Sequence, residues 1–261
     1  MKVIILAGGF GTRISEESQF KPKPMIEIGG IPILVHIMKV YSAYGFNEFI
    51  ICAGYKQHVI KEYFADYFLH TSDITYDFTG GKNEMTVHHS HSEPWKVTVV
   101  DTGLNTMTGG RIKRIREYVG NEAFLLTYGD AVGDVNIQKL VQYHQKHGKI
   151  GTVSVYNFGQ NKGVLEVSGD GSVEDFREKS DFDGDLINIG FMVFQPELFD
   201  LIDGDETVFE KGPMNKLVQM RQLNAYTHKG FWQCMDTVRE KEKLEKLWAS
   251  GNAPWKVWED R

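Results

Sequence analysis

"VIILAGGFGTR", residues 3–13, joins a short apolar run to a loop that is rich in glycine. The run is typical of a strand buried on both faces, as in the parallel sheets of α/β proteins. Gly8, Gly9 and Gly11 follow it, and glycines in such numbers weaken regular structure. Their backbone N–H groups can instead point together at a phosphate. Arg13 adds a permanent positive charge that can hold phosphate through two parallel hydrogen bonds. The stretch therefore predicts an anion-binding loop after the first strand.

This loop differs from two common phosphate-binding patterns. No Gly-Lys-Ser/Thr follows it, and its glycines do not have the G-x-G-x-x-G spacing of dinucleotide-binding proteins. A GTPase or a dehydrogenase is therefore disfavoured. A tight turn after the first strand would also explain the glycines, so the loop alone leaves both interpretations open.

Short apolar runs alternate with longer amphipathic stretches through the first half of the chain. This alternation predicts βαβ units, and hence an α/β fold with a mostly parallel central sheet and flanking helices. We expect strands at 3–7, 48–54, 123–130 and 151–156, and helices at 32–45, 56–68 and 137–148.

The second half of the chain has a different pattern. Residues 163–179 alternate on both sides of a "GDG" turn, which indicates a β-hairpin. Residues 188–202 predict a strand and then a helix, and residues 240–251 predict a closing helix. Neither an internal repeat nor a linker stands out. We therefore expect a single domain over 1–261, with a β-rich insertion at roughly 157–187 and a C-terminal helix and Trp-rich tail at 238–261.

Composition excludes several classes of function. The chain has 261 residues, 41% of them hydrophobic, and a net charge of −6 without a basic run, so we expect no nucleic-acid partner. Cys52 and Cys234 are too few for a disulfide framework. The first apolar run is too short for a signal peptide, and no run approaches the roughly 20 residues of a membrane span. These features favour a cytoplasmic protein that does not bind membranes.

The next stretch, "KPKPMIEIGGIPIL" (21–34), makes the pattern specific. Together with "LAGGFGTR" it resembles the signature of the sugar-1-phosphate nucleotidyltransferases and, among them, of the glucose-1-phosphate cytidylyltransferases. Further blocks resemble that subfamily at residues 41–56, 61–70, 93–103, 107–114, 127–130, 230–240 and 253–259.

The resemblance implies a reaction and its participants. The reaction is nucleotidyl transfer from CTP to α-D-glucose 1-phosphate, which gives CDP-glucose and pyrophosphate for polysaccharide sugar biosynthesis. The implied fold is a Rossmann-like α/β sheet with a smaller β-rich part over the sugar. The implied cofactor is Mg²⁺, the partners are CTP and a sugar 1-phosphate, and the assembly is a homo-oligomer, often a hexamer.

The resemblance also implies which residues bind the nucleotide. Arg13 would hold the β- and γ-phosphates, and Lys23 would neutralise charge at the α-phosphate. A second glycine-rich turn, "TGGR" (108–111), would present Arg111 to the nucleotide. The catalytic set is Arg13, Lys23 and Asp130. The nucleotide-binding set is Leu6, Ala7, Gly8, Gly9, Phe10, Gly11, Thr12, Arg13, Lys23, Thr106, Arg111 and Gly129.

The resemblance implies that Asp130 and Asp236 are the metal ligands. Asp130 ends a predicted strand, where parallel sheets bind their ligands, and carboxylate oxygens suit Mg²⁺. Each aspartate taken alone could instead be a helix cap or a turn residue.

The sugar side keeps some of the pattern and departs from it elsewhere. The matching residues Glu178, Lys179, Asn188 and Gly190 form the expected sugar-phosphate site, with Lys179 paired to the phosphate. Ala131, Ser180 and Ile189 depart from the family pattern. Ile189 would either restrict the sugar or be a neutral change.

Three alternative functions stay open. The chain could use another sugar 1-phosphate, it could use UTP or dTTP, or it could be a catalytically silent nucleotide-binding subunit. The histidines of "VHHSHSEPW" (87–95) have no cysteine nearby, so we expect no zinc site. The tryptophans of the tail predict packing either on the parent domain or at a subunit interface.

Overall fold

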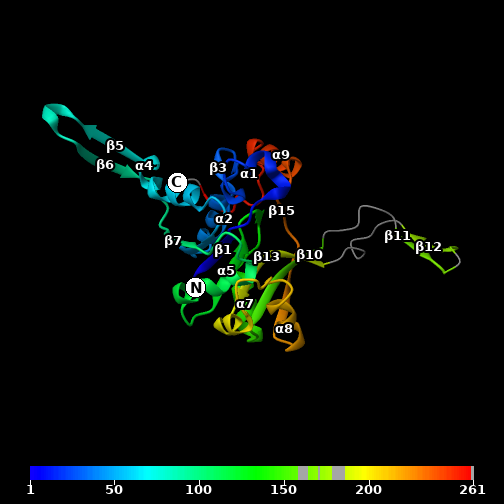
Figure 1. Cartoon of the computed structure of the whole chain (residues 1–261). Coiled ribbons are helices and arrows are strands. Elements are labelled where there is room, and N and C mark those ends of the chain that lie inside the picture. The colour runs from blue at the N-terminus through cyan, green and yellow to red at the C-terminus, as the bar shows by residue number, and fades with distance from the viewer. Residues whose placement is uncertain (158–163, 170, 178–185, 260–261) are drawn as a thin grey trace.

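The computed structural model describes residues 1–157, 164–169, 171–177 and 186–259. Its centre is a seven-stranded sheet (Figure 1). β13 runs antiparallel to both neighbours, and the other adjacent pairs are parallel, which confirms the expected mostly parallel α/β fold. The order is β14 (Leu223–His228), β10 (Gly151–Asn157), β13 (Leu186–Phe194), β8 (Phe124–Tyr128), β1 (Val3–Ala7), β4 (Glu48–Ala53) and β7 (Lys96–Asp101).

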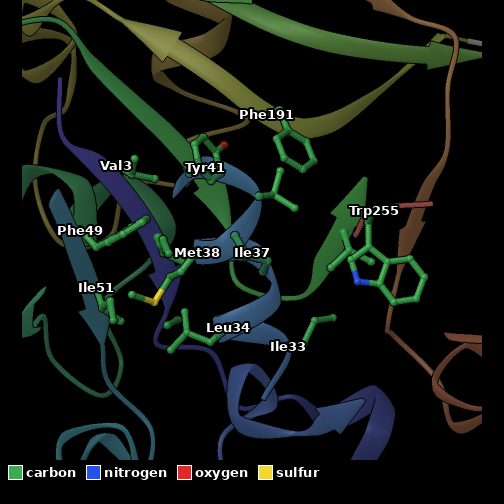
Figure 2. Close-up of a cluster of buried hydrophobic side chains, with 14 of the residues drawn as sticks. Val3, Ile33, Leu34, Ile37, Met38, Tyr41, Phe49, Ile51, Phe191 and Trp255 are labelled. Atoms are coloured by element: carbon green, nitrogen blue, oxygen red, sulfur yellow. The ribbon is translucent and has the colours of Figure 1, made fainter. Parts of the chain in front are cut away.

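Alternate residues of each central strand enter two different cores. Ile5 of β1 packs on one face of the sheet, with α2 (Ile33–Ser42), α7 (Ile137–His147) and α9 (Val238–Ala249). Figure 2 shows α2 lying against β1 and β4 on this face. The opposite face, with Leu6 of β1, is covered by α5 (Thr108–Arg114), α6 (Arg116–Val119) and α8 (Pro213–Gln219). Burial on both faces explains why the strands read as unbroken apolar runs.

Shorter elements join these layers. None of the described helices is both long and apolar enough to cross a membrane. The remaining elements are α1 (Ser15–Ser18), α3 (Gln57–Ala65), α4 (Tyr67–His70), β2 (Glu27–Ile28), β3 (Ile31–Pro32), β9 (Ala131–Gly133) and β15 (Trp232–Cys234), together with 3₁₀ turns at Thr12–Ile14, Lys23–Met25, Thr79–Gly81 and Pro196–Leu201.

In the second half of the chain, the expected hairpin is present, whereas the expected strand and helix within 188–202 are only partly present. The hairpin is confirmed as β11 (Val164–Val167) paired antiparallel with β12 (Val173–Arg177). The strand within 188–202 is confirmed as β13, but the helix after it is only the 3₁₀ turn Pro196–Leu201. The six-residue 3₁₀ turn already buries Leu198 and Phe199 against the sheet, so no longer helix is needed to cover this part of the core.

A two-stranded arm, β5 (Ser72–Asp77) with β6 (Glu84–Ser90), stands away from the body of the molecule (Figure 1). Sequence reasoning did not predict it. Cross-strand pairs place Ile74 opposite Val87 and Tyr76 opposite Met85, so these side chains share one face of the arm. The opposite face is polar, with pairs such as Thr75 and Thr86. The arm is therefore amphipathic although both of its faces meet solvent.

The tryptophan tail packs on the parent domain, as one of the two interpretations predicted. Trp255 is fully buried and stacks on Phe231, while its indole N–H donates to Nδ1 of His36 at 3.3 Å. The other ring nitrogen of His36 hydrogen-bonds the carbonyl oxygen of Ile28 at 2.9 Å. Gly29, with φ +61°, lies directly under the Trp248 ring, since a side chain there would come within 2.0 Å of it.

Candidate active site

A cavity of about 470 Å³ opens at the carboxyl ends of β1 and β8, where open parallel sheets bind ligands. The chain segment 6–13 forms one wall, and Leu104–Thr108 with Arg111 forms another. Every residue predicted to bind nucleotide or to act in catalysis lines this cavity: Leu6, Ala7, Gly8, Gly9, Phe10, Gly11, Thr12, Arg13, Lys23, Thr106, Arg111, Gly129 and Asp130.

Each of the three positions in the opening loop is occupied by glycine for a different physical reason. Gly11 has φ +66°, which favours glycine. A side chain at Gly8 would come within 2.1 Å of the Arg111 guanidinium, so Gly8 gives that group room. Gly9 meets neither requirement, because its φ is not positive and a side chain there would contact no protein atom within 4 Å. The bare backbone at Gly9 thus faces the open cavity, where a ligand can approach its N–H group.

Arg111 organises the floor of the cavity. Its guanidinium donates to the Thr102 hydroxyl at 2.8 Å and to the carbonyl oxygens of Gly103 and Leu104 at 2.7 and 3.1 Å. The side chain is almost completely buried, and burial lowers its pKa from the ordinary arginine value. Arg111 therefore ties the loop after β7 to α5 while it lines the cavity.

Lys23 links the two predicted metal ligands. Its Nζ lies 2.5 Å from Oδ2 of Asp130 and 2.5 Å from Oδ1 of Asp236. The prolines on either side, Pro22 and Pro24, hold the short 3₁₀ turn that points the lysine inward. Residues more than a hundred positions apart thus converge at one point, where the family resemblance implies that the two aspartates share an ion.

The charges at this point are mutually compensated. Burial disfavours the charged ammonium of Lys23, but the attraction of Asp130 and hydrogen bonds to both aspartates outweigh it and raise its pKa above the ordinary value. Arg13, whose side chain is 72% exposed, donates from Nη1 to the remaining oxygen of Asp236 at 2.7 Å. An exposed arginine on this short contact can turn toward another anion at low cost.

Asp236 is not the helix cap that the sequence left open. The cap of α9 is Thr237, whose hydroxyl accepts from the Glu240 N–H at 3.3 Å, while Glu240 accepts from the Thr237 N–H at 2.8 Å. Glu240 also accepts from the backbone N–H of Asp236 at 2.8 Å. This capping box orients the backbone and leaves the Asp236 carboxylate for the site.

The two carboxylates suit a cation. Both reach a single point, which Lys23 Nζ marks at 2.5 Å from each. Among the described residues, no group of three or more His, Cys, Asp or Glu side chains converges on a possible metal position. A divalent ion held here would take its other ligands from water or from substrate oxygens, as Mg²⁺ commonly does.

The sequence predicted a glycine-rich turn at "TGGR" (108–111). This prediction is wrong, because the segment is the N-terminal part of helix α5. Its glycines serve protein contacts. A side chain at Gly109 would come within 2.7 Å of the Thr207 carbonyl oxygen, and one at Gly110 within 2.5 Å of the Asp205 Cα. The glycines therefore allow a distant loop to lie directly on the helix.

Two side chains that sequence reasoning missed also line the cavity, and both donate to one carboxylate. Tyr128 lines the cavity, and its hydroxyl donates to Glu210 Oε1 at 2.6 Å. Thr108 also lines the cavity and donates to Oε2 of the same carboxylate at 2.8 Å. Tyr128 belongs to the "TYGD" block, but no local signal links Glu210 to it.

The predicted sugar-phosphate residues are only partly described. Glu178 and Lys179, like the departing residue Ser180, lie outside the described residues. Asn188 and Gly190 belong to β13, where Asn188 Oδ1 accepts from the Gly190 N–H at 2.9 Å.

Ile189, between them, is 2% exposed and belongs to the core on the α2 face of the sheet. Ala131 is also buried, at 5% exposure. Neither side chain lines the cavity.

Comparisons with known proteins agree with this geometry. The family model described as nucleotidyl transferase matches residues 2–260. The glucose-1-phosphate cytidylyltransferase of Salmonella typhi is 54% identical over 260 residues, which cover 99% of this chain and 100% of that protein. The probable glucose-1-phosphate cytidylyltransferase of Bacillus subtilis is 44% identical over 259 residues, with 99% and 100% coverage. The crystal structure of HddC from Yersinia pseudotuberculosis has the same fold, with a TM-score of 0.68 at 20% identity over 95% of this chain and 99% of that one.

Proposed function

The chain belongs to the nucleotidyl transferase family, and we propose that it transfers the cytidylyl group of CTP to α-D-glucose 1-phosphate, forming CDP-glucose and pyrophosphate. Identity of 54% over the full length of a glucose-1-phosphate cytidylyltransferase supports this choice of nucleotide and sugar. The observation that carries it is the convergence of Lys23, Asp130 and Asp236 beside the glycine loop. Since all three residues are present and in contact, the catalytically silent alternative is disfavoured.

The reaction needs positioning and charge neutralisation more than covalent catalysis. A phosphate oxygen of the sugar phosphate attacks the α-phosphorus of CTP, a new P–O bond forms, and the bond to the leaving pyrophosphate breaks in line. The N–H groups of the loop 6–13 bind phosphate oxygens, and Arg13 leaves Asp236 to hold the leaving β- and γ-phosphates. Lys23 neutralises the charge that develops at the α-phosphate.

Asp130 and Asp236 would hold the divalent metal that this family generally uses. We propose Mg²⁺, because both ligands are carboxylates and because, among the described residues, no third His, Cys, Asp or Glu side chain converges with them on a metal position. When bound, the ion offsets negative charge on the phosphates. Replacing Asp236 by Ala tests the role: turnover with Mg²⁺ should fall at least a hundredfold, and a rate near wild type would contradict the assignment.

The sugar is the less constrained half of the proposal. Asn188, Gly190, Glu178 and Lys179 are the residues that we propose for the sugar phosphate. The burial of Ile189 in the core on the α2 face of the sheet supports a neutral role for that change. The 54% identity to a glucose-1-phosphate cytidylyltransferase favours glucose 1-phosphate over another sugar.

We further propose a cytoplasmic homo-oligomer, with the hexamer as the expected size. The arm supports assembly, because Tyr76, Phe78, Met85 and Val87 are between 41 and 69% exposed on it. An isolated two-stranded ribbon with an uncovered apolar face is marginal in water. Contact with another copy of the chain would cover this face.

Pyrophosphate release tests the function directly. The assay pairs CTP, UTP, dTTP, ATP and GTP with glucose 1-phosphate and related sugar 1-phosphates, in the presence of Mg²⁺. We expect fast release with CTP and glucose 1-phosphate alone. Release with CTP and a different sugar would reassign the acceptor. Calorimetric CTP binding without release from any pair would instead identify a binding subunit.

A further inference from the structure

The loop of residues 203–212, here called the strap, connects the 3₁₀ turn Pro196–Leu201 to α8 and lies across the start of α5. Backbone N–H groups of Met107 and Gly109 donate to the strap carbonyl oxygens of Asp205 and Thr207, each at 2.8 Å. The strap is thus bound to one cavity wall by main-chain contacts, which side-chain replacements within it leave in place.

Glu210, near the end of the strap, contacts two walls of the cavity at once. Its Oε2 accepts from the Thr108 hydroxyl at 2.8 Å, and its Oε1 accepts from the Tyr128 hydroxyl at 2.6 Å. The Thr108 hydroxyl in turn accepts from the Phe209 N–H at 2.9 Å. Thr108 and Tyr128 line the cavity, whereas Glu210 is exposed and does not. One carboxylate therefore couples the two walls from outside the cavity.

Tyr128 is constrained from two directions. Its ring lies against Gly190, where a side chain would come within 2.5 Å of Cδ2. Its hydroxyl donates to Glu210 Oε1 at 2.6 Å. The ring contact and the hydrogen bond therefore hold the side chain at both ends.

The two walls serve different halves of the reaction as we propose it. Thr108 follows Thr106 along the wall that we assign to the nucleotide, whereas the Tyr128 ring contacts Gly190, which we propose for the sugar phosphate. Transfer requires the attacking oxygen and the α-phosphorus to lie at near-contact distance, and a displacement of about 1 Å costs roughly a hundredfold in rate. The rate of transfer should therefore depend on the distance between the two walls.

We propose that Glu210 is a positioning residue that sets the distance between the nucleotide wall and the sugar wall. The inference rests on the proposed function, because it assigns one substrate to each wall. Glu210 acts through Tyr128 and Thr108 and does not touch the substrates. A glutamine in its place keeps the size but accepts through one oxygen only, so one of the two hydroxyls loses its acceptor.

The test compares Glu210→Gln with wild type and with Glu206→Gln, which removes an exposed acid of the same strap. Calorimetry measures the Kd of CTP, which needs the nucleotide wall, and of CDP-glucose, which spans both walls. We expect the CTP Kd of Glu210→Gln to stay within about threefold, its CDP-glucose Kd to rise about tenfold, and its kcat to fall 10- to 100-fold. Glu206→Gln should match wild type in all three.

A double-mutant cycle separates positioning from general damage. Tyr128→Phe keeps the ring and removes the hydroxyl, so its effect on kcat should not add to that of Glu210→Gln if both act through one hydrogen bond. An additive double mutant, unchanged CDP-glucose binding, or equal weakening of CTP and CDP-glucose would each overturn the inference. Wild-type turnover of CTP with glucose 1-phosphate is measured first, because its failure would refute the proposed function, whereas a normal Glu210→Gln enzyme refutes only the role of Glu210.

Discussion

Replacing Lys23 by Gln should make the protein bind a divalent metal more tightly in the absence of nucleotide. In the present structure the ammonium donates to both carboxylates at 2.5 Å, so a metal must displace it from Asp130 and Asp236. A hydrogen bond between charged groups contributes about 1.5–3 kcal/mol. The released ammonium regains water, so we count only one of the two bonds as lost.

The expected gain is therefore about 1.5–3 kcal/mol, or roughly 10- to 150-fold in affinity. Mn²⁺ is a suitable probe, because electron paramagnetic resonance counts the free ion directly without any turnover. Lys21→Gln is the matched control, since Lys21 lies in the same motif but pairs with Glu27 at 2.7 Å. Its Mn²⁺ affinity should equal that of wild type.

The same variant should lose catalysis although it gains metal. Lys23 is the proposed neutralising charge at the α-phosphate, and removing one such group typically costs 10²- to 10³-fold in kcat. Mn²⁺ affinity that is unchanged or lower in Lys23→Gln would refute the reasoning, because it would mean that the ammonium does not compete for the carboxylates.

Three further predictions concern the loop, the core and the arm. Gly9→Ala should leave the free energy of unfolding in urea within about 0.5 kcal/mol of wild type but weaken CTP binding, measured by calorimetry, at least tenfold. Gly8→Ala should instead lower the free energy of unfolding by about 1–3 kcal/mol, because its methyl group displaces the Arg111 guanidinium. Equal stabilities of the two variants would contradict this. Burial lowers the pKa of His36 to about 4, so between pH 6.5 and 4 the unfolded chain binds a proton at this residue that the folded chain does not. The free energy of unfolding should therefore be highest above pH 6.5 and should fall by about 3 kcal/mol as the pH drops to 4. The fall should be smaller in His36→Gln. Replacing residues 73–89 by a short Gly-Ser turn should reduce the mass measured by light scattering if the arm joins copies of the chain, and an unchanged mass would exclude the arm as the contact.

The local patterns predicted β1, β4, β8, β10 and β13 because these strands are largely apolar and lie between polar turns, whereas the edge strands β7 and β14 carry more polar residues and were not predicted. β1, β4, β8 and β10 were expected within about two residues of where they lie. The arm was not expected, since polar and apolar residues alternate in its strands and neither face is buried in a core. A period-2 pattern at Ile74 and Tyr76 was present, but periodicity does not tell whether a core covers it.

Some residues of the candidate site could likewise be predicted from the sequence, and others could not. The pairing of Asp130 with Asp236 was expected from the family resemblance, whereas the contact of Lys23 with both carboxylates is known only from the structure. Glu210 could not be found, because its role depends on a strap that reaches α5 from about a hundred residues away. A long-range contact of one exposed glutamate has no signature in composition or spacing.

The convergence of Lys23 with Asp236 has a consequence for the order of events on the ribosome. Roughly two hundred residues separate them, and translation at about 5–20 residues per second makes the lysine wait some 10–40 seconds for its second aspartate. The early sheet pairing of β1 with β4 needs no such delay, whereas the layer over α2 needs Trp255. The site that we propose for the metal is therefore completed only near the end of synthesis, although its glycine loop is among the first segments made.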